Sequence, residues 1–242
     1  MKYTSIYRLI IAAIILGATS FLLVTKANST KSSSDTPASI SPQQVLQQLQ
    51  EGNKRFIQGD MKNHDLLTQV KKTASKQTPV ALVLDCMDSR TSPELIFDQG
   101  IGDIFVTRVA GNILNDDILG SMEYGAQVAG IKLIAVIGHT NCGAVQGACE
   151  QAQLGHLTNL LHKIQPAVIQ ATKEVGSQDC KKPSYINQIA KDNVLLVINE
   201  IQAKSPVIKK LLDDKKIGII GGIQDLATGK VTFFDAQNVD IK

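Results

Sequence analysis

The sequence has few of the features that mark nucleic-acid-binding proteins. Of its 242 residues, 4% are aromatic and none is Trp, and no run of basic residues is longer than two. The chain therefore lacks both the positive surface and the stacking surface that nucleic acid requires. Charged residues make up only 19% of the chain, whereas 43% are hydrophobic. This composition excludes nucleic acid as a partner and predicts one sizeable buried core.

Long uncharged runs are also scarce, and the one that stands out is N-terminal. Lys2 and Arg8 precede an uncharged run at 9–24, which is short for a membrane span and has the layout of a secretory signal. Small residues favour cleavage after Ala27, so we expect 1–27 to be a signal peptide of an exported protein, periplasmic or secreted. An uncleaved anchor is the alternative, and membrane contact is expected only in that case. This segment holds three basic residues and no acidic one, so the net charge of +3 belongs to it.

After this segment the chain divides into a linker and one domain. Residues 28–40 are dense in Ser and Thr and predict a flexible linker. Ser41-Pro42 then has the pattern of a helix start, an N-cap followed by Pro. We therefore expect a single α/β domain at 41–242.

The hydrophobic pattern of this domain alternates between strands and helices. Apolar or β-branched runs predict strands at 80–84, 103–109, 132–137, 216–220 and 230–235. Helical spacing predicts helices at 42–57, 118–129, 143–154, 166–173, 184–204 and 206–212. This order is typical of an α/β fold with a mainly parallel central β-sheet flanked by helices. A turn at Thr228-Gly229 favours an antiparallel C-terminal strand.

Two short clusters of metal-binding residue types directly follow predicted strands. They are Cys86-Met-Asp88-Ser-Arg90 and His139-Thr-Asn-Cys142. In an open parallel sheet the carboxyl ends of neighbouring strands meet at one edge, so the two clusters should converge if their strands are neighbours. Two thiolates and one imidazole suit zinc, and three protein ligands leave a fourth position open.

The chain has only four cysteines, and two of them lie outside these clusters. Cys149 is interpreted as a small buried residue of the helix that follows Cys142. A disulfide between Cys149 and Cys180 is the alternative, which an exported protein permits. The spacing of these two cysteines does not match a four-cysteine zinc site.

From residue 41 to 240 the sequence resembles the β-class carbonic anhydrase family. The motifs that carry the resemblance are the two clusters, extended to Gly138-His139-Thr140-Asn141-Cys142-Gly143-Ala144, together with the segments at 93–98, 110–112, 121–125 and 225–231. Where the family has Val-Ala-Asn, this chain has Val109-Ala110-Gly111-Asn112. The resemblance implies that Cys86, His139 and Cys142 are the zinc ligands.

The same resemblance implies a reaction and a catalytic pair. The reaction is the reversible hydration of carbon dioxide to bicarbonate and a proton by zinc-bound hydroxide. Asp88 and Arg90 are the implied catalytic residues that govern the fourth zinc position. We expect Arg90 to hold Asp88 off the metal in the active state, with Asp88 as the fourth ligand of an inactive state.

The resemblance also implies substrate-binding residues and an assembly. Gln77 is the candidate that orients carbon dioxide or bicarbonate, Tyr124 and Phe105 are candidates for the pocket wall, and Gly143 is a further substrate-binding candidate. Because the family completes its pocket across a dimer interface, a homodimer or a dimer of dimers is implied.

Two other functions remain open at this stage. A hydrolase of carbon disulfide or carbonyl sulfide could use the same zinc site, and a non-catalytic zinc protein would keep Asp88 permanently on the metal.

Overall fold

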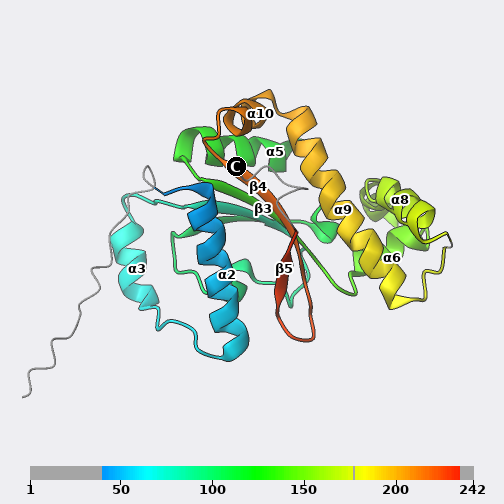
Figure 1. Cartoon of the computed structure of the whole chain (residues 1–242), viewed down its shortest axis with the longest axis horizontal. Helices are drawn as coiled ribbons and strands as arrows, with labels where there is room; N and C mark the ends of the chain where they lie inside the picture. Colours follow the sequence, from blue (N-terminus) through cyan, green and yellow to red (C-terminus); the bar gives the residue numbers. More distant parts are fainter. Residues whose placement is uncertain (1–39, 177, 235–242) are drawn as a thin grey trace, which may run out of the picture. The chain divides into compact units, whose positions relative to one another are not determined.

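A five-stranded sheet in the order β2-β1-β3-β4-β5 is the centre of the fold (Figure 1). The strands are β1 (Ala81–Asp85), β2 (Ile104–Arg108), β3 (Leu133–His139), β4 (Gly218–Gln224) and β5 (Val231–Phe233). All neighbouring strands pair in parallel except β4 and β5, which pair antiparallel. The structure, a computed structural model, describes residues 40–176 and 178–234. The predicted mainly parallel sheet with an antiparallel last strand is confirmed.

Helices flank this sheet along the chain. They are α2 (Pro42–Gln58), α3 (Leu66–Thr73), α4 (Pro93–Ile96), α5 (Asp116–Glu123), α6 (Gly143–Cys149), α7 (Gly155–His162), α8 (Gln165–Val175), α9 (Pro183–Lys204) and α10 (Pro206–Asp213). A short 3-10 turn, η1 (Ala110–Asn112), and a π-helical segment, η2 (Tyr124–Ala129), complete them. None of the helices in this described part of the chain has the length and apolarity needed to cross a membrane.

Two predicted helices differ from the structure, and helices α3, α4 and α7 were not predicted. The helix expected at 143–154 ends at Cys149, because Gln151 and Gly155 both adopt a positive φ that breaks the helix. The helix expected at 118–129 changes to π-helical geometry from Tyr124. Helix α3 is short, and its apolar residues Leu66, Leu67 and Val70 are all exposed, so none of them belongs to the core.

The first helix of the domain begins at a complete capping box. The backbone N–H of Gln44 donates to the Ser41 side chain, and the Gln44 side chain accepts from the Ser41 N–H. Ile40 and Val45, on either side of this cap, are both buried in the core. The prediction that residue 40 belongs to the flexible linker is therefore wrong. The rest of that linker and the predicted signal segment lie outside the described residues.

Helix α9 joins the two apolar clusters of the fold. It packs on β3 and β4, while α6 and α8 lie beside it (Figure 1). Its first half, including Ile186 and Ile189, belongs to a cluster with α6 and α8 that also contains Cys86 and Cys142. Its second half, including Val194 and Ile198, packs into the main core with the strands. The segments that carry Cys86 and Cys142 therefore pack against the same helix as the sheet does.

Cys149 and Cys180 form a disulfide that connects the end of α6 with the segment leading into α9. The sequence interpretation that favoured Cys149 as an unpaired core residue is therefore corrected, although Cys149 is indeed buried. The disulfide could not be predicted from the local sequence pattern, because the two cysteines are separated by 31 positions and meet only in the folded chain.

A buried carboxylate links α2 to the end of α4. The Asp98 side chain is fully buried and forms an ion pair with Arg55. It also accepts hydrogen bonds from the Lys62 N–H at 3.2 Å and contacts His64 Nε2 at 3.0 Å. Burial alone raises the pKa of Asp98, but the bonds from Arg55, Lys62 and His64 outweigh it and lower the pKa below its usual value. Asp98 therefore stabilises the fold in its ionised form.

We predict that Asp98→Asn lowers the free energy of unfolding by about 3 kcal/mol at pH 7, because it removes one partner of a buried ion pair. Asn has the same size and tolerates the positive φ of this position. Since the folded pKa is depressed, the stabilisation is present above the unfolded pKa of about 4 and is lost as pH falls through the folded pKa. Urea unfolding at pH 7 and at lower pH measures both effects.

The control is Asp213→Asn, an exposed carboxylate in a surface pair with Lys209, which should change stability by less than about 0.5 kcal/mol. A deficit of Asp98→Asn that persists undiminished in strong acid would contradict this account of Asp98.

Candidate metal centre

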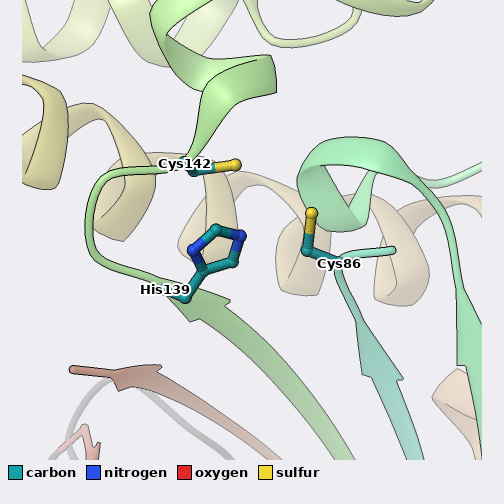
Figure 2. A group of neighbouring side chains, drawn as sticks. All are labelled: Cys86, His139 and Cys142. Atoms are coloured by element: carbon teal, nitrogen blue, oxygen red, sulfur yellow. The ribbon is translucent and has the colours of Figure 1, made fainter. Parts of the chain in front are cut away.

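Three potential metal ligands converge at the carboxyl edge of the sheet. Cys86 directly follows β1, His139 is the last residue of β3, and Cys142 is the N-cap of α6. Because β1 and β3 are parallel neighbours, their ends lie at the same edge. The ligand atoms of the three side chains all lie within 4.8 Å of one another, and all three residues are buried. Figure 2 shows the two sulfur atoms and the imidazole facing one space. The predicted convergence of the two clusters is confirmed.

The imidazole of His139 is oriented for metal binding. Its Nδ1 lies 2.9 Å from the Thr140 carbonyl oxygen, which can only accept, so Nδ1 carries the proton and donates. The other ring nitrogen, Nε2, is buried and has no hydrogen-bond partner among the described residues. An unprotonated, unpartnered nitrogen beside two thiols is the arrangement a metal requires, and a backbone carbonyl commonly fixes the tautomer of such a ligand.

The two cysteine side chains lie close together, and each shifts the pKa of the other. The pKa of the Cys86 thiol is lowered, chiefly by the neighbouring Cys142 thiol. The same interaction raises the pKa of Cys142. The backbone N–H of Gly111 also points at Cys86 Sγ, at 3.3 Å. Cys86 is therefore prepared as a thiolate, the form that binds metals.

Asp88 and Arg90 form a bidentate ion pair beside the cluster. Arg90 Nε donates to Asp88 Oδ1 at 2.9 Å, its Nη2 donates to Oδ2 at 2.7 Å, and its backbone N–H also donates to Oδ1. These bonds hold the pKa of Asp88 well below its usual range. Asp88 Oδ2 lies 4.0 Å from His139 Nε2, so the carboxylate borders the three-ligand cluster without belonging to it.

Arg108, a residue that the sequence interpretation did not single out, holds the first cluster in place. Its Nε donates to the Cys86 carbonyl at 2.9 Å, and its Nη2 donates to the Asp88 carbonyl and to Thr91. The Thr91 hydroxyl bonds the same two carbonyls. The Arg at the end of the mostly apolar strand β2 could be recognised in the sequence, but its hydrogen-bond partners could not.

Asp85 is a second polar residue at this edge that the sequence interpretation missed. It is buried at the end of β1, and its Oδ1 accepts a 2.6 Å hydrogen bond from the Cys86 N–H. Burial raises the pKa of Asp85 to about 7, although the Cys86 N–H, His139 and Arg108 oppose the shift. The hydrogen bond from the Cys86 N–H to the Asp85 side chain further restrains the position of Cys86.

The structure does not bring every predicted site residue to the cluster. Gly143 follows Cys142 and is exposed there. Gln77 is exposed before the amino end of β1, whereas Cys86 follows its carboxyl end. Phe105 pairs with Leu82, four residues before Cys86, which is about 13 Å along a strand.

Phe105 and Tyr124 instead lie together, away from the metal ligands. Their ring centroids are 6.4 Å apart. With Val106, Thr107 and Asp116 they help to line a cavity of about 660 Å3 beside β2. Within one chain this cavity is separate from the cluster formed by Cys86, His139 and Cys142.

Comparisons with known proteins agree on one family. A family profile described as "Carbonic anhydrase" matches residues 81–231. Carbonic anhydrase 2 of Mycobacterium tuberculosis is 31% identical over 193 residues, covering 77% of this chain and 90% of that protein. Carbonic anhydrase of Mycolicibacterium smegmatis is 30% identical over 189 residues, covering 76% of this chain and 88% of that protein.

Solved structures show the same relationship. The structure of the β-carbonic anhydrase CcaA superposes with a TM-score of 0.65 at 28% identity, covering 80% of this chain and 96% of that chain. A tetrameric β-carbonic anhydrase from Sordaria macrospora shares the fold with a TM-score of 0.62 at 23% identity, covering 69% of this chain and 89% of that chain.

Proposed function

The chain belongs to the β-class carbonic anhydrase family, and we propose on that premise that zinc held by Cys86, His139 and Cys142 serves the reversible hydration of carbon dioxide to bicarbonate. The observation that carries this proposal is the free, buried Nε2 of His139 facing two cysteine sulfurs. Sulfur and imidazole nitrogen are the donors that select zinc, and three protein ligands are typical of catalytic rather than structural zinc sites. The chemistry that zinc supplies in such a site is activation of water as a nucleophile near neutral pH.

Asp88 and Arg90 provide the polar groups beside this centre. Because Arg90 occupies both carboxylate oxygens in one plane, it fixes the direction of Asp88 and restrains it from approaching the ligand cluster. The lowered pKa keeps Asp88 ionised, so its remaining lone pairs can only accept hydrogen bonds. Asp88 is thereby suited to accept a hydrogen bond from a reacting water. This bond would turn the lone pair of the water oxygen toward carbon dioxide.

Stopped-flow measurement of carbon dioxide hydration tests the function. Zinc-loaded protein should accelerate hydration, chelator-treated protein should not, and added zinc should restore the rate. His139→Ala should lose both zinc and activity, whereas His156→Ala, at an exposed position of α7, should keep both. A zinc-loaded protein with no hydration activity would leave zinc a non-catalytic role and refute the enzyme proposal.

Arg90→Ala tests the role of the ion pair. We expect turnover to fall by about 10²-fold, because Asp88 loses its fixed orientation, while zinc content stays near one per chain because no ligand is removed. The control is Lys182→Ala, which removes an exposed charge from a surface pair far along the chain. Normal turnover of Arg90→Ala, measured beside its zinc content, would show that the pair does not position the reacting groups.

We propose further that two chains associate along β2. Among the described strands, β2 pairs only with β1, so its other edge offers free backbone donors and acceptors. Apolar side chains are exposed nearby, with Tyr124 54% and Val128 69% accessible. Association there would cover these side chains and the adjoining cavity. This association would also allow Gln77, which lies far from Cys86, His139 and Cys142 of its own chain, to contact substrate in the site of the partner chain. The family resemblance implies such a pocket, completed across a dimer interface.

Light scattering tests this association. The protein should have the mass of a dimer or a dimer of dimers, and Tyr124→Arg should shift it toward a single chain, because a charge at a packed apolar contact is costly. Val175→Arg, at an exposed apolar residue of α8, should not change the mass. A monomeric wild-type protein with full activity would contradict both the interface and the role of Gln77.

We also propose that the protein is exported to an oxidising compartment, with 1–27 as its signal. The Cys149–Cys180 disulfide supports this location, because such bonds are uncommon in reducing compartments. Thiol titration of denatured, metal-free protein isolated from its host without reductant should detect Cys86 and Cys142 alone. Four reactive thiols would count against export.

A further inference from the structure

Helix α9 contacts two turns beside the candidate metal ligands through two asparagine side chains. Asn193 Nδ2 donates to the Gly111 carbonyl oxygen at 2.9 Å. Asn187 Oδ1 accepts a hydrogen bond from the Asn141 N–H at 3.1 Å, between the ligands His139 and Cys142. One rigid helix therefore holds the turn that touches Cys86 and the turn that carries the other two ligands.

The contact with Gly111 continues to a metal ligand. Gly111 accepts the bond from Asn193 with its carbonyl, and its own N–H donates to Cys86 Sγ at 3.3 Å. The direction of this N–H depends on an unusual backbone: Gly111 has a φ of 68°, and a Cβ there would approach Ile164 to 2.7 Å. Asn193 fixes the peptide group on one side of Gly111, so it restrains the N–H on the other.

Asn193 makes no other side-chain hydrogen bond within the described residues. It is 1% exposed, and its Oδ1 has no partner there. Burying an amide side chain is unfavourable unless its polar groups are hydrogen-bonded. The hydrogen bond to Gly111 is therefore the interaction that compensates for burying the Asn193 side chain.

We propose that Asn193 is a positioning residue of the metal centre, which acts through the Gly111 turn to hold the N–H that donates to the Cys86 sulfur. The inference rests on the proposed zinc site and extends it to a group that touches neither metal nor substrate. A hydrogen bond to a thiolate draws electron density from sulfur and fixes its direction, so its loss changes both the strength and the geometry of the metal–sulfur bond.

The test compares Asn193→Leu with wild type in the full chain. Leu has the same branching and number of side-chain heavy atoms as Asn, and it removes the donor without adding a charge. Zinc release to a chromogenic chelator should be at least about tenfold faster, the usual effect of losing such a supporting contact. In cobalt-substituted protein, the sulfur-to-cobalt charge-transfer band should move to lower energy, because the sulfur becomes more electron-rich. Asn199→Leu, an exposed site on the same helix, should leave both readouts unchanged.

Melting temperatures of the zinc-free and zinc-loaded forms separate positioning from a purely structural role. A positioning role predicts that Asn193→Leu gains a smaller increase in melting temperature from zinc than wild type does. A purely structural role lowers both forms equally and leaves zinc release and the cobalt band unchanged, and this result would overturn the inference. If Asn193→Leu does not fold, Asn193→Ser, too short to reach Gly111, replaces it in the same comparison. Absence of zinc binding in wild type would instead refute the proposed zinc site itself.

Discussion

The parallel pairing of β1 with β3 sets the position of every group in the metal centre. Leu84 pairs with Val136 near the end of the register, so the chain leaves both strands at the same edge of the sheet. Cys86 lies at one exit, and His139 and Cys142 lie at the other. Strand spacing of about 4.8 Å brings side chains at neighbouring exits within reach of a single metal ion. A shift of register would separate these ligands, and the buried apolar residues of both strands oppose such a shift.

Backbone hydrogen bonds make the centre rigid. The Thr140 carbonyl orients His139, and the Gly111 N–H meets the sulfur of Cys86. Arg108 and Thr91 hold the carbonyls of the first cluster. Each bond forms at a turn that leaves a strand or enters a helix, where backbone groups lack partners in regular structure. The fold thus uses its own unpaired backbone groups to hold the side chains of Cys86 and His139 in place.

Helix α9 connects this rigidity to the core. Its second half packs on the sheet, while its first half and two asparagines contact the turns beside the candidate metal ligands. The Cys149–Cys180 disulfide adds a covalent link between α6, which begins beside Cys142, and the segment before α9. A loop of about 30 residues closed in this way contributes about 3–4 kcal/mol in the chain-entropy view. Stability and ligand geometry therefore depend on the same packing of α6, α8 and α9.

The sequence alone determined the strands, their mainly parallel order and the three residues that converge at the carboxyl edge of the sheet. Apolar runs and helix caps are local patterns, and two metal-binding clusters after two such runs could be recognised without coordinates. Other contacts could be seen only in the tertiary structure. Arg108 reaches a residue 22 positions away, Asn193 one 82 positions away, and Cys149 its partner 31 positions away. Helix α3, which has no buried face, was not predicted. The local spacing of apolar residues decides which helices and strands form. The long-range packing of those elements decides which polar side chains meet, and these contacts cannot be predicted from the periodicity of the sequence.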